Sequence, residues 1–265
     1  MVNTAGKQKN NWEFKRIGVV PKMKSVVFIE GLPGIGNVGK IAVDFIIENK
    51  KAKMIYEIFS YDLPHSVFVQ EDNLVELPKL HLYHVKIGKQ DFVFLSGDVQ
   101  PLSERSCYEF CESLLDVLEK LDVKQIVTLG GIGLGKLPKK PTVFSTGNDQ
   151  KLIKEFKKKN KDINTNPYGV IGPVVGVTGL LVGLAGKRKM PGIALLAETF
   201  AHPMYLGMKG ARAMLNVLNN QFSFKLSMKD LDKEITDIEY ELILKTKDMK
   251  GAVKGMKDKS LNYIG

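Results

Sequence analysis

The stretch SVVFIEGLPGIGNVGKIAVDFI, residues 25–46, sets the fold of the chain around it. Residues 25–30 form a short apolar run rich in β-branched side chains that ends at a cluster of glycines, which is typical of a buried strand. After the cluster, apolar residues recur at helical spacing from Val38 to Glu48. The stretch therefore predicts a strand, a glycine turn and a helix.

The glycine turn also matches two phosphate-binding signatures. Gly34, Gly36 and Gly39 fit G-x-G-x-x-G, and the segment from Gly34 to Lys40 fits G-x-x-x-x-G-K. However, Ile41 stands where a P-loop needs Ser or Thr to hold magnesium. Glycines at the top of a strand also permit a tight turn and a close helix-to-strand approach without any ligand. We expect this structural role and no cofactor, with nucleotide binding by the three glycines and Lys40 as the alternative.

The rest of the chain alternates strand-like and helix-like segments. A meander is predicted from residues 66–70, 80–87 and 91–95, and Ser103 is the expected N-cap of a helix that runs to Leu121. Residues 130–141 are predicted to be a loop. The remaining predicted strands are 53–59, 125–129, 142–145 and 192–196, and the remaining predicted helices begin near residues 149, 173 and 207. This alternation predicts an α/β fold with a mixed, largely parallel sheet covered on both faces.

Charge and hydropathy exclude two classes of partner. The net charge is +10, but the basic excess is confined to residues 1–24, 151–161 and 245–265, and the rest of the chain is mildly acidic. The lysine run has no interleaved aromatic residues, so we expect no specific nucleic-acid binding. The longest apolar stretch, residues 170–185, is too short to span a membrane and is broken by glycines. We expect a soluble cytoplasmic protein that makes no membrane contact.

Catalytic and metal-binding residues are not evident in the sequence. No pair among the four histidines has zinc-site spacing, and Cys107 and Cys111 lie on a predicted amphipathic helix, where free cysteines behave as small hydrophobic residues. Asp98 and Glu198, each after an apolar strand, are the best polar candidates, although Glu198 fits a capping role at Thr199 better. We therefore predict no enzymatic activity, no catalytic residues and no metal.

The chain beyond residue 225 changes character. A 3,4,3,4 spacing of apolar residues resembles a heptad seam, which predicts either an oligomer interface or packing of the same stripe on the chain's own domain. These seam residues are Met228, Leu231, Ile235, Ile238 and Leu242. We divide the chain into a polar N-terminal extension (1–20), an α/β domain (21–225), a C-terminal amphipathic helix (226–250) and a flexible basic tail (251–265).

Three segments together resemble the archaeal members of the proteasome assembly chaperone type-two family. They are VVFIEGLPGIGNVGKIAVDFI (26–46), IVTLGGIG (126–133) and GPVVGVTGLLVGLAGKRKMPGIALLAETF (172–200). The resemblance implies a phosphorylase-like three-layer α/β/α sandwich and a homo-oligomer. It also implies a non-enzymatic role in assembling or binding the proteasome core. Some relatives are labelled ATP-grasp-like, so the alternative is a nucleotide-binding enzyme, either an ATP-grasp-like ligase or an NAD-dependent enzyme, using residues 31–40.

The resemblance also directs attention to the C-terminus. Relatives that bind the proteasome resemble its ATPase activators in using a C-terminal motif of a hydrophobic residue, tyrosine and any residue. Here tyrosine is third from the end and Asn262 replaces the hydrophobic residue, so the match is not direct. The hypothesis is that the tail still contacts proteasome α subunits through Tyr263, Ile264 and Gly265.

Overall fold

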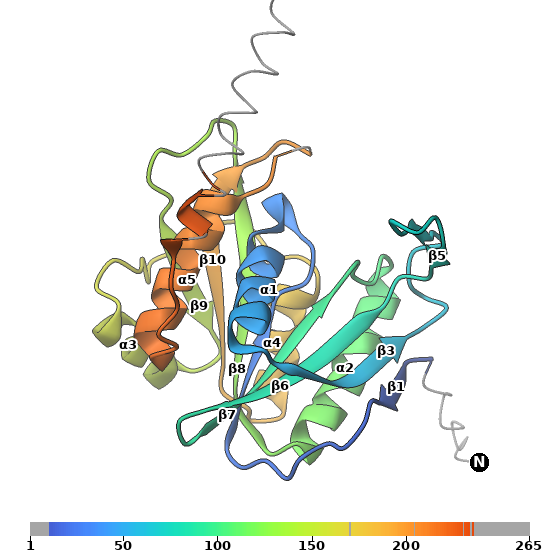
Figure 1. Cartoon of the computed structure of the whole chain (residues 1–265). Coiled ribbons are helices and arrows are strands. Elements are labelled where there is room, and N and C mark those ends of the chain that lie inside the picture. Colours follow the sequence, from blue (N-terminus) through green and yellow to red (C-terminus); the bar gives the residue numbers. More distant parts are fainter. Residues whose placement is uncertain (1–10, 170, 204, 230, 234, 236–265) are drawn as a thin grey trace, which may run out of the picture. The chain divides into compact units, whose positions relative to one another are not determined.

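The computed structural model describes residues 11–235, apart from residues 170, 204, 230 and 234 (Figure 1). Its internal contacts divide the chain into two units, residues 1–226 and residues 227–265. The first unit is an α/β sandwich built on one large sheet, and the candidate site lies within it. Among the described residues, no helix is both long and apolar enough to cross a bilayer.

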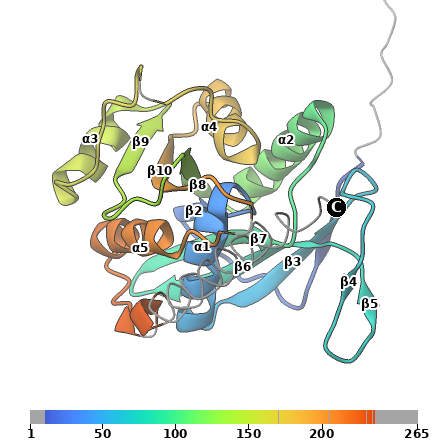
Figure 2. The same ribbon diagram turned by 90° about the horizontal axis from the view of Figure 1, so that it is seen from above.

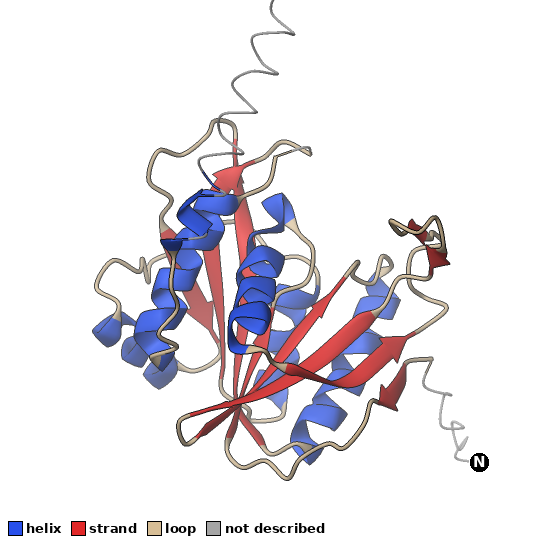
Figure 3. Cartoon of the chain, viewed as in Figure 1, coloured by secondary structure: helices blue, strands red, loops and turns tan. Residues whose placement is uncertain are grey.

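The large sheet has eight strands in the order β1-β3-β6-β7-β2-β8-β10-β9 (Figure 3). The four central strands, β7, β2, β8 and β10, are parallel, and the strands on either side are antiparallel to their neighbours. Their bounds are β1 Glu13–Arg16, β2 Val26–Glu30, β3 Lys53–Phe59, β6 Leu80–Ile87, β7 Gln90–Gly97, β8 Val123–Leu134, β9 Val143–Gly147 and β10 Gly192–Phe200. The sheet is mixed, as predicted, with its parallel part at the centre.

Helices cover both faces of this sheet, which gives three layers (Figures 1 and 2). Helices α1 and α5 pack together on one face, and α2 and α4 pack together on the other. Helix α3 lies at the β9 edge next to α5. The bounds are α1 Val38–Lys50, α2 Glu104–Lys120, α3 Gln150–Lys159, α4 Val177–Lys187 and α5 Met208–Phe222. The predicted three-layer α/β/α sandwich is therefore confirmed.

Strand β2 shows how the helices on the two faces are attached to the sheet. All five of its residues are buried, as expected for a central strand with helices on both sides. Val26 and Phe28 belong to the core cluster formed with α2 and α4. Since side chains alternate along a strand, Glu30 points to the same face. A carboxyl group is thus placed at the end of the central strand, beneath α2 and α4.

Two predicted elements are wrong in detail. Residues 66–70 do not join the meander: β4 (Phe68–Val69) pairs only with β5 (Val75–Glu76), in a separate two-stranded sheet. Residues 130–134 are not a loop, because β8 continues to Leu134 and β10 pairs with it along its whole length. Glycines there favoured a loop locally, but pairing with β10 satisfies the backbone hydrogen bonds as an extended strand.

One element was not anticipated at all. Residues 13–16, within the segment assigned to a polar extension, form strand β1, which pairs antiparallel with β3. Trp12 before it is buried, and its ring lies 4.6 Å from that of Phe110 in α2, measured between centroids. Trp12, the partly buried Phe14 and the pairing with β3 thus hold this strand on the core.

Candidate functional site

The glycine turn is a tight link between β2 and α1. A single 3₁₀ turn, η1 (Ile35–Asn37), precedes the first residue of α1. Gly36 has a φ of 62° and Asn37 a φ of 51°, so two successive residues adopt the left-handed conformation. Gly36 and Asn37 are residue types that tolerate this conformation, which explains why the chain can turn so sharply here.

The space beside these glycines is filled by the chain itself. A Cβ atom on Gly39 would overlap the carbonyl oxygen of Leu129 in β8, and one on Gly131 would overlap the carbonyl oxygen of Ile35. On Gly31 it would overlap the carbonyl oxygen of Gly39. The glycines therefore let α1 and the turn lie directly on the backbone of β8. In this arrangement, the glycine pattern serves the packing of helix on strand.

Lys40, the basic residue of the second signature, is paired within its own helix. Its Nζ lies 2.8 Å from a carboxylate oxygen of Asp44, one helical turn later. The other oxygen of Asp44 accepts a hydrogen bond from Ser96 in β7. Gly34 and Gly39 line the cleft described next, whereas Gly36 and Lys40 do not. The four residues proposed above for nucleotide binding therefore do not all line the same cleft.

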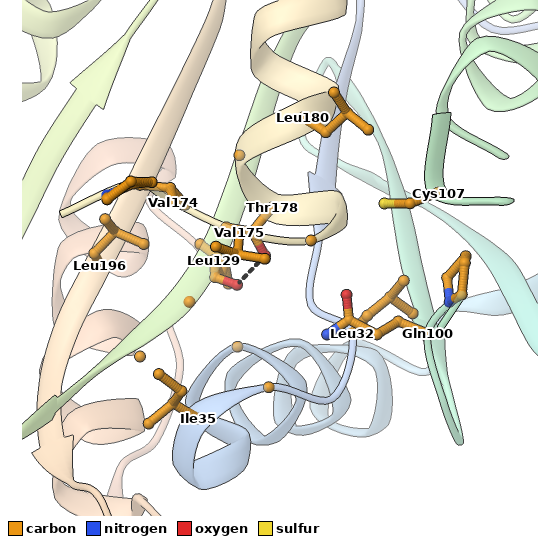
Figure 4. Close-up of a pocket in the computed structure, with 18 of the residues that line it drawn as sticks. Leu32, Ile35, Gln100, Cys107, Leu129, Val174, Val175, Thr178, Leu180 and Leu196 are labelled. Carbon is orange, nitrogen blue, oxygen red and sulfur yellow. Dashed lines mark hydrogen bonds between the residues drawn. The ribbon is translucent and has the colours of Figure 1, made fainter. Parts of the chain in front are cut away.

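A cleft of about 1020 Å³ lies at the carboxyl ends of the central strands. Its walls come from the glycine turn, the end of β8, the start of α2, and α4 with the loop before it (Figure 4). Figure 4 shows the side chains of Leu32, Ile35, Val175 and Leu180 arranged around the opening. Among the described residues that line it, Glu104 is the only one with a charged side chain. The cleft is therefore suited to an apolar occupant.

Gln100 ties two walls of the cleft together. Its side-chain amide donates a hydrogen bond to the carbonyl oxygen of Pro33 in the glycine turn. Its Oε1 accepts a hydrogen bond of 3.4 Å from the backbone N–H of Val177, the first residue of α4. Gly176, with a φ of 81°, lets the chain pass close to this amide, because a Cβ there would lie 2.7 Å from Oε1. Gln100 thus fixes the spacing between the turn and α4, a role that sequence patterns did not reveal.

Glu30 lies beneath the cleft and is fully buried. Its carboxyl oxygens accept hydrogen bonds from the Leu32 N–H at 2.8 Å and from the Thr178 hydroxyl at 3.3 Å. Burial raises the pKa of Glu30 to about 7, although these two hydrogen bonds oppose the rise. Glu30 was not predicted as a site residue; its only signal in the sequence is an acid at the end of an otherwise apolar strand.

The cysteines and the two acids considered from the sequence have structural contacts. Cys107 lines the cleft, and Cys111 is buried behind it. A hydrogen bond with Cys107, together with burial, raises the pKa of Cys111, so its thiol stays protonated. Glu198 accepts a hydrogen bond of 2.8 Å from the Thr142 N–H rather than capping Thr199. Asp98 accepts one from a backbone N–H at 3.2 Å. Within the described ranges, no group of three or more metal-ligating side chains is found.

The C-terminal candidates are only partly described. In the second unit, Met228, Leu231 and Ile235 are described, and the Asp232 N–H donates to the Met228 carbonyl at the spacing of an α-helix. Ile238 and Leu242 of the heptad seam lie outside the described residues. The same holds for Tyr263, Ile264 and Gly265 of the tail.

Comparisons with known proteins agree over most of the chain. The model of the PAC2 family matches residues 28–243. An uncharacterized protein of Methanocaldococcus jannaschii is 30% identical over 257 residues, which is 95% of this chain and 96% of the relative.

Two solved structures from Pyrococcus furiosus have the same fold. PbaB, described as an archaeal proteasome activator, is 28% identical, with a TM-score of 0.83 over 90% of this chain and 99% of its own. PbaA, described as an archaeal homolog of proteasome-assembly chaperone, is 25% identical, with a TM-score of 0.69 over 91% of this chain and 99% of its own.

Proposed function

Since the chain belongs to the PAC2 family, we propose that it is a non-enzymatic proteasome assembly chaperone or a proteasome-binding factor. The observation that carries this proposal is the likeness to PbaB, which extends over nine tenths of the chain. PbaB is described as an archaeal proteasome activator. The likeness to PbaA, described as a homolog of proteasome-assembly chaperone, supports the same class of partner.

The geometry of the glycine turn supports a binding role over the enzyme alternative. Backbone atoms occupy the positions where a side chain on Gly31, Gly39 or Gly131 would begin. Close packing alone therefore explains the glycine pattern. The cleft nearby is apolar, whereas a nucleotide site needs cationic groups or magnesium ligands around the phosphates.

The proposal includes a homo-oligomer with the apolar seam at an interface between copies. The seam consists of Met228, Leu231, Ile235, Ile238 and Leu242. In this proposal, residues 226–250 form the helix that joins the copies. Residues 251–265 form a tether that presents Tyr263, Ile264 and Gly265 to proteasome α subunits. Several copies of the tail on one assembly would raise the effective concentration of each, which compensates for a weak single contact.

Capture of the proteasome core by the immobilised full-length chain tests this function. We expect the core particle, or free α subunits, to be retained at about 0.15 M salt, where exposed charges more than about 8 Å apart are largely screened. The matched variant replaces Leu261–Gly265 with Gly and Ser residues of equal number, which keeps the tail length. Failure of the unmodified chain to retain any proteasome subunit would overturn the function. Equal retention by the variant would exclude only the tail contact.

A further inference from the structure

A two-stranded arm projects from the antiparallel side of the α/β unit. We define the arm as residues 66–77, which include β4 and β5. Its strands pair only with each other, and Figures 1 and 2 both show it standing apart from the helices. An isolated two-stranded hairpin is at best marginally stable in water, so an arm of this kind gains stability from a surface that covers it.

Both faces of the arm carry apolar side chains, and one of them also carries the acid Glu76. In its paired registers, Phe68 lies opposite Glu76 and Val69 opposite Val75, so apolar side chains project to each side. Val69 and Val75 are 70% and 62% exposed. The other apolar side chains of the arm that are exposed are Val67, Phe68, Leu74 and Leu77. Such a concentration of exposed apolar surface marks an interaction site.

The cleft offers a matching apolar surface. Its volume of about 1020 Å³ is at the upper end of the range for small-molecule pockets, about 300–1,000 Å³, and most of its lining side chains are apolar. Leu102 and Val175 on its walls are 72% and 85% exposed. Gly183 in α4 also lines it, and a Cβ placed there would meet no atom within 4 Å. The cleft therefore has room for apolar side chains from another polypeptide.

The arm and the loop that follows the β8 wall of the cleft carry opposite charges, whereas the one charged side chain in the cleft lining is the acid Glu104. The arm carries three acidic residues, Glu71, Asp72 and Glu76, and no basic one. The loop after β8, which continues from the strand that forms one wall of the cleft, carries exposed lysines and no acid between residues 135 and 141. These are Lys136, Lys139 and Lys140. Opposite charges around two apolar surfaces favour their association in one orientation.

We propose that the arm of one copy of this chain docks in the cleft of a second copy, with the acidic arm next to the basic loop after β8. This contact deepens the homo-oligomer of the proposed function and rests on it, but it uses a surface distinct from the C-terminal seam. Because the arm and the cleft are different surfaces, the contact closes either as a two-fold pair, in which each arm enters the partner's cleft, or head to tail as a ring.

Two variants separate the two sides of the contact. The arm variant combines Val69→Asp with Val75→Asp, which places charges on exposed side chains and leaves the core untouched. The cleft variant is Gly183→Leu, which fills space that is empty in the single chain and improves the helix propensity of α4. A matched control is Lys151→Leu, since Lys151 is an exposed residue of helix α3 at the β9 edge and belongs to neither the cleft, the arm nor the basic loop.

Native mass spectrometry and light scattering of the full-length chains give the readout. We expect each of the two variants to raise the dissociation constant between copies about 30-fold or more, as loss of a central interface contact does, and the control to leave it unchanged. Mixing the two variants is the decisive measurement. The arm variant retains an intact cleft and the cleft variant an intact arm, so we expect mixed pairs to form where neither variant pairs with itself.

Several results would overturn the contact. The first is that the unmodified chain is monomeric. The second is that either variant assembles as the unmodified chain does, and the third is that the two variants fail to associate when mixed. An arm variant that stays oligomeric but no longer captures proteasome subunits would show that the arm faces the partner instead. Capture of the core by a monomeric variant leaves the proposed function standing, so the two proposals fail independently.

Discussion

Gly39 and Gly183 form a natural pair for testing what the glycines do, because both lie in helices and only one is crowded. We expect Gly39→Ala to lower the free energy of unfolding by about 1–3 kcal/mol, since its Cβ would overlap the Leu129 carbonyl oxygen and force α1 away from β8. We expect Gly183→Ala to be neutral or to stabilise by up to about 1 kcal/mol. Urea unfolding of both variants measures this; equal effects would contradict the packing role of the turn.

Glu30 makes the stability of the protein depend on pH in a defined direction. The folded-state pKa is about 7 against an ordinary value of 4.5, so between these values the folded chain holds a proton that the unfolded chain has lost. Stability from this residue is therefore full below about pH 4.5 and falls as pH rises to about 7, by up to about 3 kcal/mol.

The variant Glu30→Gln isolates that dependence, because glutamine has a similar shape and does not ionise. We expect the free energy of unfolding of the unmodified chain to drop more between pH 5 and pH 8 than that of Glu30→Gln. Urea titrations at both pH values give the difference, and other titrating groups cancel in the comparison. If both chains lose the same stability, the buried carboxyl does not titrate as described.

At the scale of single residues, sequence patterns predicted the turn but not the site around it. The spacing of Gly34, Gly36 and Gly39 is visible in the sequence, and so is the cap at Ser103, whose hydroxyl accepts from the Ser106 N–H at 3.1 Å. Gln100 was not predicted, because its role depends on two segments, around Pro33 and Val177, that meet only in the fold.

At the scale of elements, strand β1 is held by its pairing with β3 and by the burial of Trp12 beside it, and the contribution of Trp12 can be tested directly. We expect Trp12→Ala to cost about 3–5 kcal/mol, the usual loss for a large aromatic residue removed from a core. Trp12 is also the only tryptophan, so its fluorescence in the unmodified chain reports the docking of β1. The exposed Lys15→Ala on the same strand is the control. A similar stability for both variants would mean that β1 docks without Trp12.

Most elements were predictable because they follow simple periodicities. The strands at 53–59 and 80–87 match β3 and β6 at both ends, and the helix predicted to begin near residue 149 is α3, whose N-cap Asp149 accepts a hydrogen bond from the Leu152 N–H at 2.9 Å. The errors lie where tertiary pairing decides. Residues 130–133 extend β8 because β10 pairs with them, and residues 68–69 pair with β5 instead of joining the main sheet.

At the scale of the whole molecule, the enzyme alternative makes a quantitative prediction that differs from ours. A nucleotide present at 100 times its dissociation constant stabilises the folded state by about 2.7 kcal/mol, which raises the melting temperature measurably. We expect no shift with ATP or NAD at millimolar concentration, with or without magnesium. The arrangement of Lys40 with Asp44, away from the cleft, is the reason. A dose-dependent rise in melting temperature would restore the nucleotide alternative.

The position of β2 at the centre of the sheet has a consequence for synthesis on the ribosome. Its neighbours are not its successors in the chain: Val27 pairs with Phe92, and Glu30 pairs with Thr128, 98 residues later. At a synthesis rate of about 5–20 residues per second, the fully buried strand β2 is made roughly 5–20 s before its second partner, β8. During that interval a strand with four consecutive apolar residues has an unpaired edge, which favours aggregation. The nascent chain therefore needs protection from aggregation until β8 is complete.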